Sequence, residues 1–85
     1  MSGGPLDPAP LEAARLELGL SVSQLWMRCF ALGGVLAPLD LTASLEGRRK
    51  FGARDFDVVV HALNESYVEL GRNHPLAYAD QLVRR

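Results

Sequence analysis

The sequence has a single cysteine, no long apolar run and no excess of charge of either sign, and each of these absences excludes a class of protein. With Cys29 alone, the chain can build neither an internal disulfide framework nor a zinc cluster of cysteines. No apolar run approaches the roughly 18 residues of a membrane-spanning helix. The 9 basic and 10 acidic residues argue against a strong electrostatic grip on nucleic acid or on an anionic membrane.

The beginning of the sequence, MSGGPLDPAP, also lacks the basic segment and apolar core of a secretion signal. Together with the lone cysteine, this absence leads us to expect a cytoplasmic protein. The glycines and prolines of this stretch predict a flexible lead-in over residues 1–8. Residues 9–85 are enough for one domain and too few for two, so we expect a single helical domain there.

What the sequence does contain is apolar residues, 48% of the chain, that recur at helical spacing. Glycines close four of the five segments that carry this pattern, and no pair of alternating strands with a hairpin turn occurs. We therefore predict an all-α fold, a compact bundle of four helices plus a short C-terminal helix or ordered tail. The predicted helices are about Pro8–Leu18, Val22–Leu32, Pro38–Glu46, Asp55–Leu70 and Pro75–Val83.

The second and fourth predicted helices have the clearest patterns, so we expect them to form the central pair. Ser21 and Gln24 have the spacing of a capping box at the start of the second helix. The run Val58-Val59-Val60 would fit a strand if taken alone. The helical spacing continues over four turns, however, and favours a helix. For the other starts we expect Asp7 as the first N-cap, and Asn73 or His74 as the fifth.

Two groups of residues could in principle carry chemistry. His61 and Glu65 share a helix face, but two ligands do not make a zinc site and no third His or Cys has a matching spacing. Two solvated polar side chains are the simpler interpretation. Cys29 falls within the apolar stripe of the second helix, which favours a buried, inert thiol over a nucleophile. We therefore predict no enzyme, no catalytic residue, no metal and no cofactor.

The basic loop Arg48-Arg49-Lys50, with Arg54 just beyond it, is the one cluster of like charge in the sequence. It could contact phosphate, nucleic acid or an acidic protein face, although a plain solvated loop also fits. DNA binding by a helix-turn-helix-like unit of residues 22–54 is the alternative function. The five-residue connection 33–37 is longer than usual for that motif, and the third helix carries acids where base-reading residues are expected.

The second helix is apolar on more than one face, and apolar residues continue up to Leu41. Both a core role and an interface role fit this stretch, residues 26–41. Our leading hypothesis is a non-enzymatic protein-interaction module, a small regulatory protein whose partner is another protein or a second copy in a homodimer. Affinity would come from apolar anchors with a charged rim. The expected partner contacts are Trp26, Phe30 and Leu41, with Arg48 and Arg49 at the edge.

Two stretches, LSVSQLWMRCFALGG at residues 20–34 and HALNESYVELGRNHPLAYAD at residues 61–80, resemble small helical proteins of actinobacteria that have no assigned activity. Eight of the nine basic residues are Arg, a bias that fits a GC-rich genome. The resemblance covers about two thirds of the chain. It implies a bacterial cytosolic protein with a regulatory role, and it carries over no catalytic residue.

Overall fold

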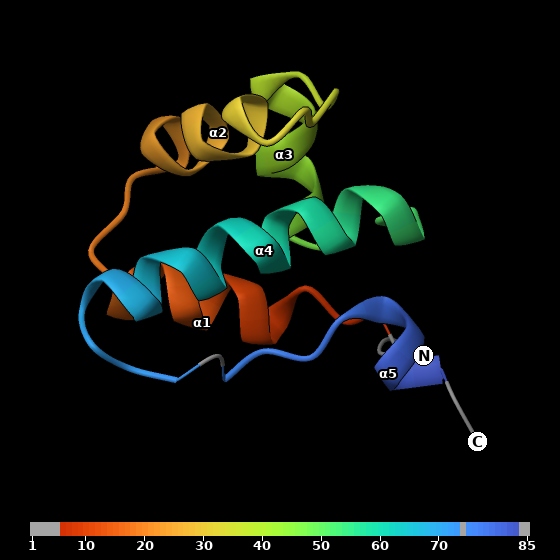
Figure 1. Ribbon diagram of the computed structural model, residues 1–85. Helices are drawn as coiled ribbons and strands as arrows, with labels where there is room; N and C mark the ends of the chain where they lie inside the picture. Colours follow the sequence, from red (N-terminus) through yellow and green to blue (C-terminus); the bar gives the residue numbers. More distant parts are fainter. Residues whose placement is uncertain (1–5, 74, 84–85) are drawn as a thin grey trace.

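The longest run of helical spacing in the sequence forms the longest helix, α4, in the middle of the molecule (Figure 1). Its buried apolar side chains recur every three or four residues and make one broad face. The computed structural model describes residues 6–73 and 75–83, and no strand occurs among them. The all-α prediction is confirmed. The helices are α1 (Ala9–Glu17), α2 (Val22–Ala31), α3 (Pro38–Leu45), α4 (Ala53–Glu69) and α5 (Ala79–Val83).

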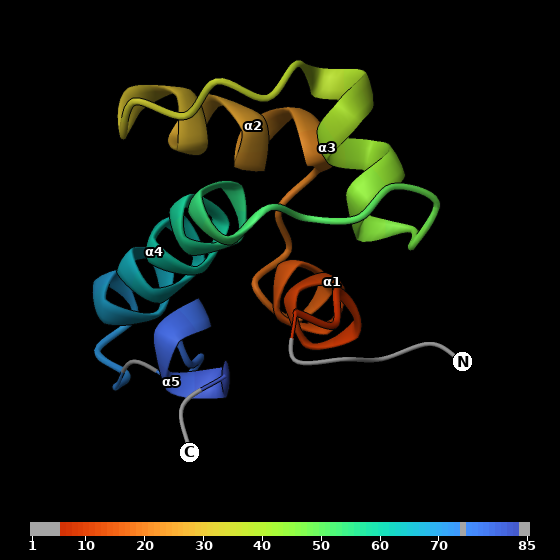
Figure 2. The same cartoon turned by 90° about the vertical axis from the view of Figure 1, so that its right-hand side faces the viewer.

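Two layers of helices cover α4. In Figures 1 and 2, α2 and α3 lie above it, and α1 and α5 lie below it. Helix α4 packs against α1, α2 and α5, so it is in contact with both layers, and α2 packs against both α3 and α4. Buried apolar side chains from all five helices join in one cluster. None of the helices described in the structure is long and apolar enough to cross a bilayer.

Local signals fix most of the helix ends. Ser21 and Gln24 form the predicted capping box: the Ser21 hydroxyl accepts the Gln24 N–H at 3.0 Å, and the Gln24 side chain accepts the Ser21 N–H at 2.8 Å. The first four helices each end at a glycine with positive φ, where a residue without Cβ is favoured. These signals are contained within a few residues of sequence, which is why the prediction found them.

The N-terminal part differs from the predicted one by a residue or two. Helix α1 begins at Ala9 rather than Pro8, and Asp7 Oδ1 accepts the Ala9 N–H at 3.0 Å. Residues 1–5 of the predicted lead-in lie outside the described residues. Leu6, in the part of the predicted lead-in that the structure describes, packs against the core.

The C-terminal segment is held by side chains of α4 and by one local contact, in which Gln81 Oε1 accepts the Tyr78 N–H at 2.7 Å. The buried Asn64 pairs with both main-chain groups of Leu76: its Nδ2 donates to the carbonyl at 3.0 Å, and its Oδ1 accepts the N–H at 3.2 Å. Asp57 Oδ1 accepts the Ala79 N–H at 2.7 Å, at the start of α5. Helix α5 therefore begins at Ala79. The predicted start at Pro75 is wrong, and the proposed cap His74 lies outside the described residues.

Candidate functional site

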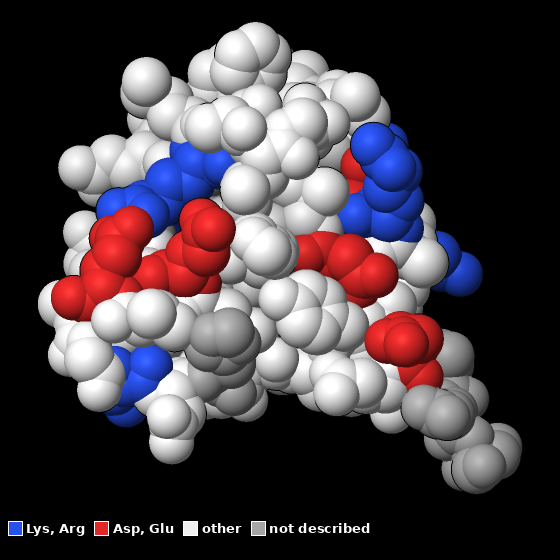
Figure 3. Space-filling model, viewed as in Figure 1, with Lys and Arg blue, Asp and Glu red and all other residues white. Residues whose placement is uncertain are grey.

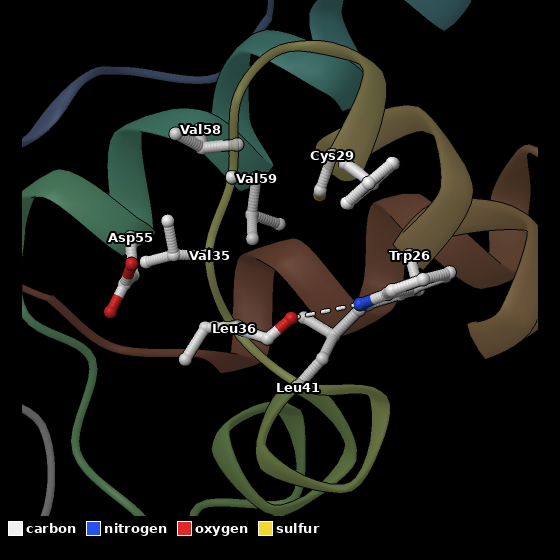
Figure 4. A pocket seen from close by; sticks show the side chains of 10 residues that line it. Trp26, Cys29, Val35, Leu36, Leu41, Asp55, Val58 and Val59 are labelled. Carbon is white, nitrogen blue, oxygen red and sulfur yellow. Dashed lines mark hydrogen bonds between the residues drawn. The ribbon is translucent and has the colours of Figure 1, made fainter.

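A shallow apolar hollow, open to solvent and with room for about one water molecule, lies between α2, the connecting segment 33–37 and the N-terminal half of α4. Figure 4 shows its walls, with Trp26 and Cys29 on the α2 side, Asp55 and Val58 on the α4 side and the connecting segment between them. Asp55 is the one charged residue in its lining. The lining residues are Trp26, Cys29, Phe30, Gly34, Val35, Leu36, Leu41, Asp55, Val58 and Val59.

Trp26 fixes the connecting segment against α2. Its indole N–H donates to the Leu36 carbonyl at 2.8 Å, so a half-buried ring also satisfies a loop carbonyl (Figure 4). The same ring stacks on Phe30 with the ring centroids 5.3 Å apart. These two contacts set the position of one wall of the hollow and hold the Phe30 ring beside its mouth.

Gly34 lets the connecting segment approach α2 and α4 closely. Its N–H donates to the Cys29 carbonyl at 2.8 Å. A Cβ at residue 34 would lie 2.8 Å from that oxygen and 3.1 Å from a methyl of Val58. Only a residue without a side chain fits here, so the shape of the hollow depends on this glycine.

The predicted apolar contacts divide into exposed and buried residues. Phe30 is 64% exposed and Val35 76% exposed, and both line the hollow. Trp26 is half-buried. The prediction of Leu41 as a partner contact is wrong, because Leu41 is 1% exposed and belongs to the core. Its neighbour Leu39 is 83% exposed instead, on the opposite side of α3.

The predicted basic rim is paired with two acids, Asp40 in α3 and Glu46 at the C-cap of that helix. Arg48 forms an ion pair with Glu46 at 2.6 Å, and Arg49 lies 4.0 Å from Asp40. Neither arginine is among the lining residues of the hollow. In Figure 3 the top of the visible face shows no charged side chain, whereas Lys and Arg side chains lie along the lower edge of the region over α2 and at the right-hand side. The lining of the hollow itself is apolar apart from Asp55 and polar main-chain groups.

Within the described part of the chain, the chemistry-bearing side chains singled out from the sequence are a buried thiol and an exposed His–Glu pair. Burial raises the pKa of the Cys29 thiol to about 12, so the thiol stays protonated near neutral pH. His61 Nε2 lies 3.2 Å from Glu65 Oε2, and both side chains are about half exposed. Tyr78 joins this pair through its hydroxyl, 3.4 Å from His61 Nδ1. Within residues 6–73 and 75–83, no group of three or more His, Cys, Asp or Glu side chains could hold a metal ion.

Sequence reasoning missed the contribution of α4 to the hollow. Asp55 and Val58 were assigned only to the pattern of a long helix, and Val35 only to surplus apolar surface. Val58 is 23 residues from Val35 in sequence, and the two meet only because the connecting segment folds back over α4. The one local signal was the apolar content of the Gly33-Gly34-Val35-Leu36 connection, which is unusual for a solvated loop.

Comparison of the chain with known protein families, with curated proteins and with solved structures finds no match.

Proposed function

We propose that this chain is a non-enzymatic protein-interaction module, a small regulatory protein of the bacterial cytoplasm, that binds a partner protein at the apolar hollow. The observation that carries the proposal is the exposure of Phe30 and Val35 directly beside an apolar depression. Scattered exposed apolar residues are normal on any surface. Two large ones at the mouth of a hollow are typical of a contact surface.

The exposed apolar surface of Phe30 is large enough for this residue to anchor a protein interface. Phe30 leaves 64% of its surface exposed, which for an aromatic side chain is on the order of 130 Å². Covering that area would contribute about 3 kcal/mol before the costs of association. Aromatic anchors that insert among apolar neighbours supply much of the affinity of protein interfaces. Phe30 is also stacked on Trp26, so less side-chain freedom is lost on binding.

The hollow is too small to enclose a small molecule. Ligand sites typically enclose most of the ligand. This hollow opens to solvent and has room for about one water molecule. It can therefore only form part of a broader contact surface. The nearest reactive group, the Cys29 thiol, is buried and protonated and has no role in the proposal.

Affinity capture with the purified chain tests this function. Phe30→Glu places a charge at the mouth of the hollow, and Leu16→Glu places the same charge on α1 at a residue of matching exposure, 63% against 64%. We expect wild type and Leu16→Glu to retain the same protein, whether a cytosolic partner or the chain itself, and Phe30→Glu to lose it. Equal retention by all three chains would refute a partner site at the hollow.

The alternative, DNA binding through residues 22–54, has less support. The exposed side of α3 presents Asp40 and Glu46, and acids there repel phosphate. Arg48 and Arg49 turn toward these acids, which reduces the positive charge available to DNA. A salt titration with random duplex DNA distinguishes the two functions. Steeply salt-dependent binding that Arg48→Ala weakens would favour DNA over protein.

A further inference from the structure

We propose that residues 75–83 form a displaceable strap over a peptide-binding site on α4, and that a segment of another protein with the same pattern of side chains can take its place. The site is a polar stripe on α4 that consists of Asp57, His61 and Asn64. In Figures 1 and 2, α5 lies below α4 and α2 lies above it, and no strap residue lines the hollow. The stripe is therefore a second site, separate from the one in the proposed function.

The two outer residues of the stripe hold the main chain of the strap. Asn64 donates to the Leu76 carbonyl at 3.0 Å and accepts the Leu76 N–H at 3.2 Å, and Asp57 accepts the Ala79 N–H at 2.7 Å. Asp57 precedes Asn64 whereas Ala79 follows Leu76, so the strap runs antiparallel to α4 (Figure 1). These side chains bind main-chain groups, which nearly every residue of any peptide carries. The resting chain thus shows a structural contact that another peptide can also make.

The spacing of these contacts suits a short, non-helical peptide. Asp57 and Asn64 are seven residues apart on α4, which is about 10.5 Å along the helix axis. Their main-chain partners are only three residues apart, and three residues of non-helical chain span at most about 10–11 Å. A few residues of peptide can therefore reach both contacts without the rest of the strap.

The side chains of the strap define what a competing peptide needs. Leu76 and Tyr78 are half-buried against the core, and the Tyr78 hydroxyl lies 3.4 Å from His61 Nδ1, in the middle of the stripe. Ala79 is 4% exposed, so its place accepts only a small side chain. The expected ligand is a peptide with an apolar residue, a tyrosine two positions later and an alanine directly after the tyrosine.

Few other contacts hold the strap in place. Helix α5 has five residues, too few for a helix that is stable by itself, and it packs against α4. Ala79 is the one strap residue in the buried apolar core, whose other buried members come from α1 to α4 and Phe51. Departure of the strap would uncover the stripe and leave this core in place. Terminal segments with few buried contacts open at a lower free energy than the whole fold.

Native-state hydrogen exchange of the wild-type chain tests whether the strap opens by itself. After correction for intrinsic rates, the Leu76 and Ala79 amides should exchange at least about 10-fold faster than the amides of Val60 and Leu63, which are fully buried in α4. Nuclear magnetic resonance resolves each amide. Equal rates would mean that the strap opens only when the whole molecule unfolds, and would overturn the proposal.

A labelled peptide tests whether the stripe accepts a ligand. The probe is a fluorescein-labelled peptide with the sequence of residues 75–83, PLAYADQLV, and fluorescence anisotropy follows its binding to the full chain. In wild type the strap occupies the stripe, and the apparent affinity falls with the fraction of chains whose site is free. Ala79→Pro in the chain removes the N–H that Asp57 accepts, at a helix start where proline is tolerated. This variant should bind the peptide at least several-fold more tightly than wild type.

The same substitution in the peptide is the matched control. A peptide that carries Ala79→Pro lacks the N–H for Asp57 and should bind the variant chain at least several-fold more weakly than the unchanged peptide. Equal binding of the two peptides would overturn the proposal. So would no binding of the unchanged peptide at roughly 1 mM, a concentration at which even a weak complex forms.

A second variant loosens the strap without touching α4. Gln81→Ala removes the side chain that accepts the Tyr78 N–H at 2.7 Å, so it should also strengthen binding of the peptide. Circular dichroism shows that each variant chain remains folded. Phe30→Glu, in α2, should leave peptide binding unchanged. Loss of capture at the hollow and loss of peptide binding at the stripe thus concern different sites, and either proposal can fail alone.

Discussion

Cys29 shows how burial decides the reactivity of a single residue. Its side chain faces the hollow but is only 6% exposed, and burial raises the pKa of the thiol to about 12. The sequence correctly predicted a buried thiol, because Cys29 lies on the same helix stripe as Leu25. Thiol chemistry proceeds through the thiolate, so the low exposure and the raised pKa both lower the reactivity of Cys29.

We expect iodoacetamide at pH 8 to modify Cys29 of the folded chain roughly 100-fold or more slowly than in concentrated urea, because the folded thiol is protonated and covered. Mass spectrometry over time measures both rates. Similar rates in the two solvents would contradict the burial seen here. The folded protein is not destabilised by this thiol at pH 8. The raised thiol pKa lowers the stability of the fold only as the pH rises above the ordinary value of 9.0 toward 12.

Asn64 is a polar residue in the core whose function is structural. It is 1% exposed, and its amide satisfies both main-chain groups of Leu76. We expect Asn64→Ala to lower the free energy of unfolding by about 2–3 kcal/mol, because two hydrogen bonds are lost and buried groups are left unpaired. Urea denaturation followed by circular dichroism gives the value. The exposed Asn73→Ala is the matched control and should change stability by less than about 0.5 kcal/mol.

At residue level the sequence could not tell which leucine of α3 is buried. Leu39, Leu41 and Leu45 all lie within one short helix, and its apolar residues do not fall on a single face. Leu41 and Leu45 are buried, whereas Leu39 is 83% exposed. The choice depends on where α1 and α2 pack against α3, and no local pattern in the sequence contains that information.

Among the elements, prediction succeeded where the signals were local. The limits of the first four helices were predicted within about two residues, because caps, prolines and closing glycines act over a single turn. The start of α5 was wrong by four residues. The Leu76 main chain is held by Asn64, twelve residues away, which excludes it from a helix. Contacts of this kind follow only from the fold.

The connecting segment 33–37 offers a test at the level of elements. At Gly34 an added Cβ would meet the Cys29 carbonyl at 2.8 Å, so we expect Gly34→Ala to cost about 1–3 kcal/mol through overpacking. Gly33 has positive φ but open space around its Cβ position. Gly33→Asn should therefore be milder, since Asn tolerates a left-handed backbone. Urea denaturation of both variants ranks them, and an equal or reversed order would contradict the close packing at Gly34.

At the scale of the whole molecule, a hydrogen bond and two ion pairs connect α4 and the residues just after it to both layers. Glu17 of α1 accepts the Tyr67 hydroxyl at 2.5 Å and pairs with Arg72 at 3.3 Å. Arg28 of α2 holds Glu69 of α4 through two contacts of 3.1 and 3.2 Å. The sequence did not predict these pairs, because their members are about 40 to 55 residues apart.

These contacts lower the pKa values of two carboxyl groups. The Tyr67 hydroxyl and then Arg72 lower the pKa of Glu17, and Arg28 lowers that of Glu69. A lowered folded-state pKa gives stability that is present above the ordinary value of 4.5 and is lost as the pH falls below it. We expect the urea midpoint to fall between pH 6 and pH 3. The double variant Glu17→Gln, Glu69→Gln should show a smaller fall, and an unchanged fall would assign the effect to other groups.

The hollow itself is a property of the whole molecule. Its walls come mainly from α2, the connecting segment and α4. The exposed residues at its mouth lie beside a hollow only because those parts pack together. The sequence predicted that residues 26–41 contain more apolar surface than a small core needs. It did not predict that three of the ten lining residues would come from α4, because the packing angle between helices is not encoded in a local pattern.

The indole of Trp26 has one more consequence, for optical measurement. It is the only tryptophan of the chain, it stacks on Phe30, and its N–H bonds to the segment that walls the hollow. Ultraviolet emission excited at long wavelength therefore comes from one position, beside the proposed contact. A partner protein that covers the hollow would exclude water from this ring and shift its emission toward the blue. The native protein thus carries its own fluorescent reporter of docking, and dilution of an unlabelled complex should reverse the shift.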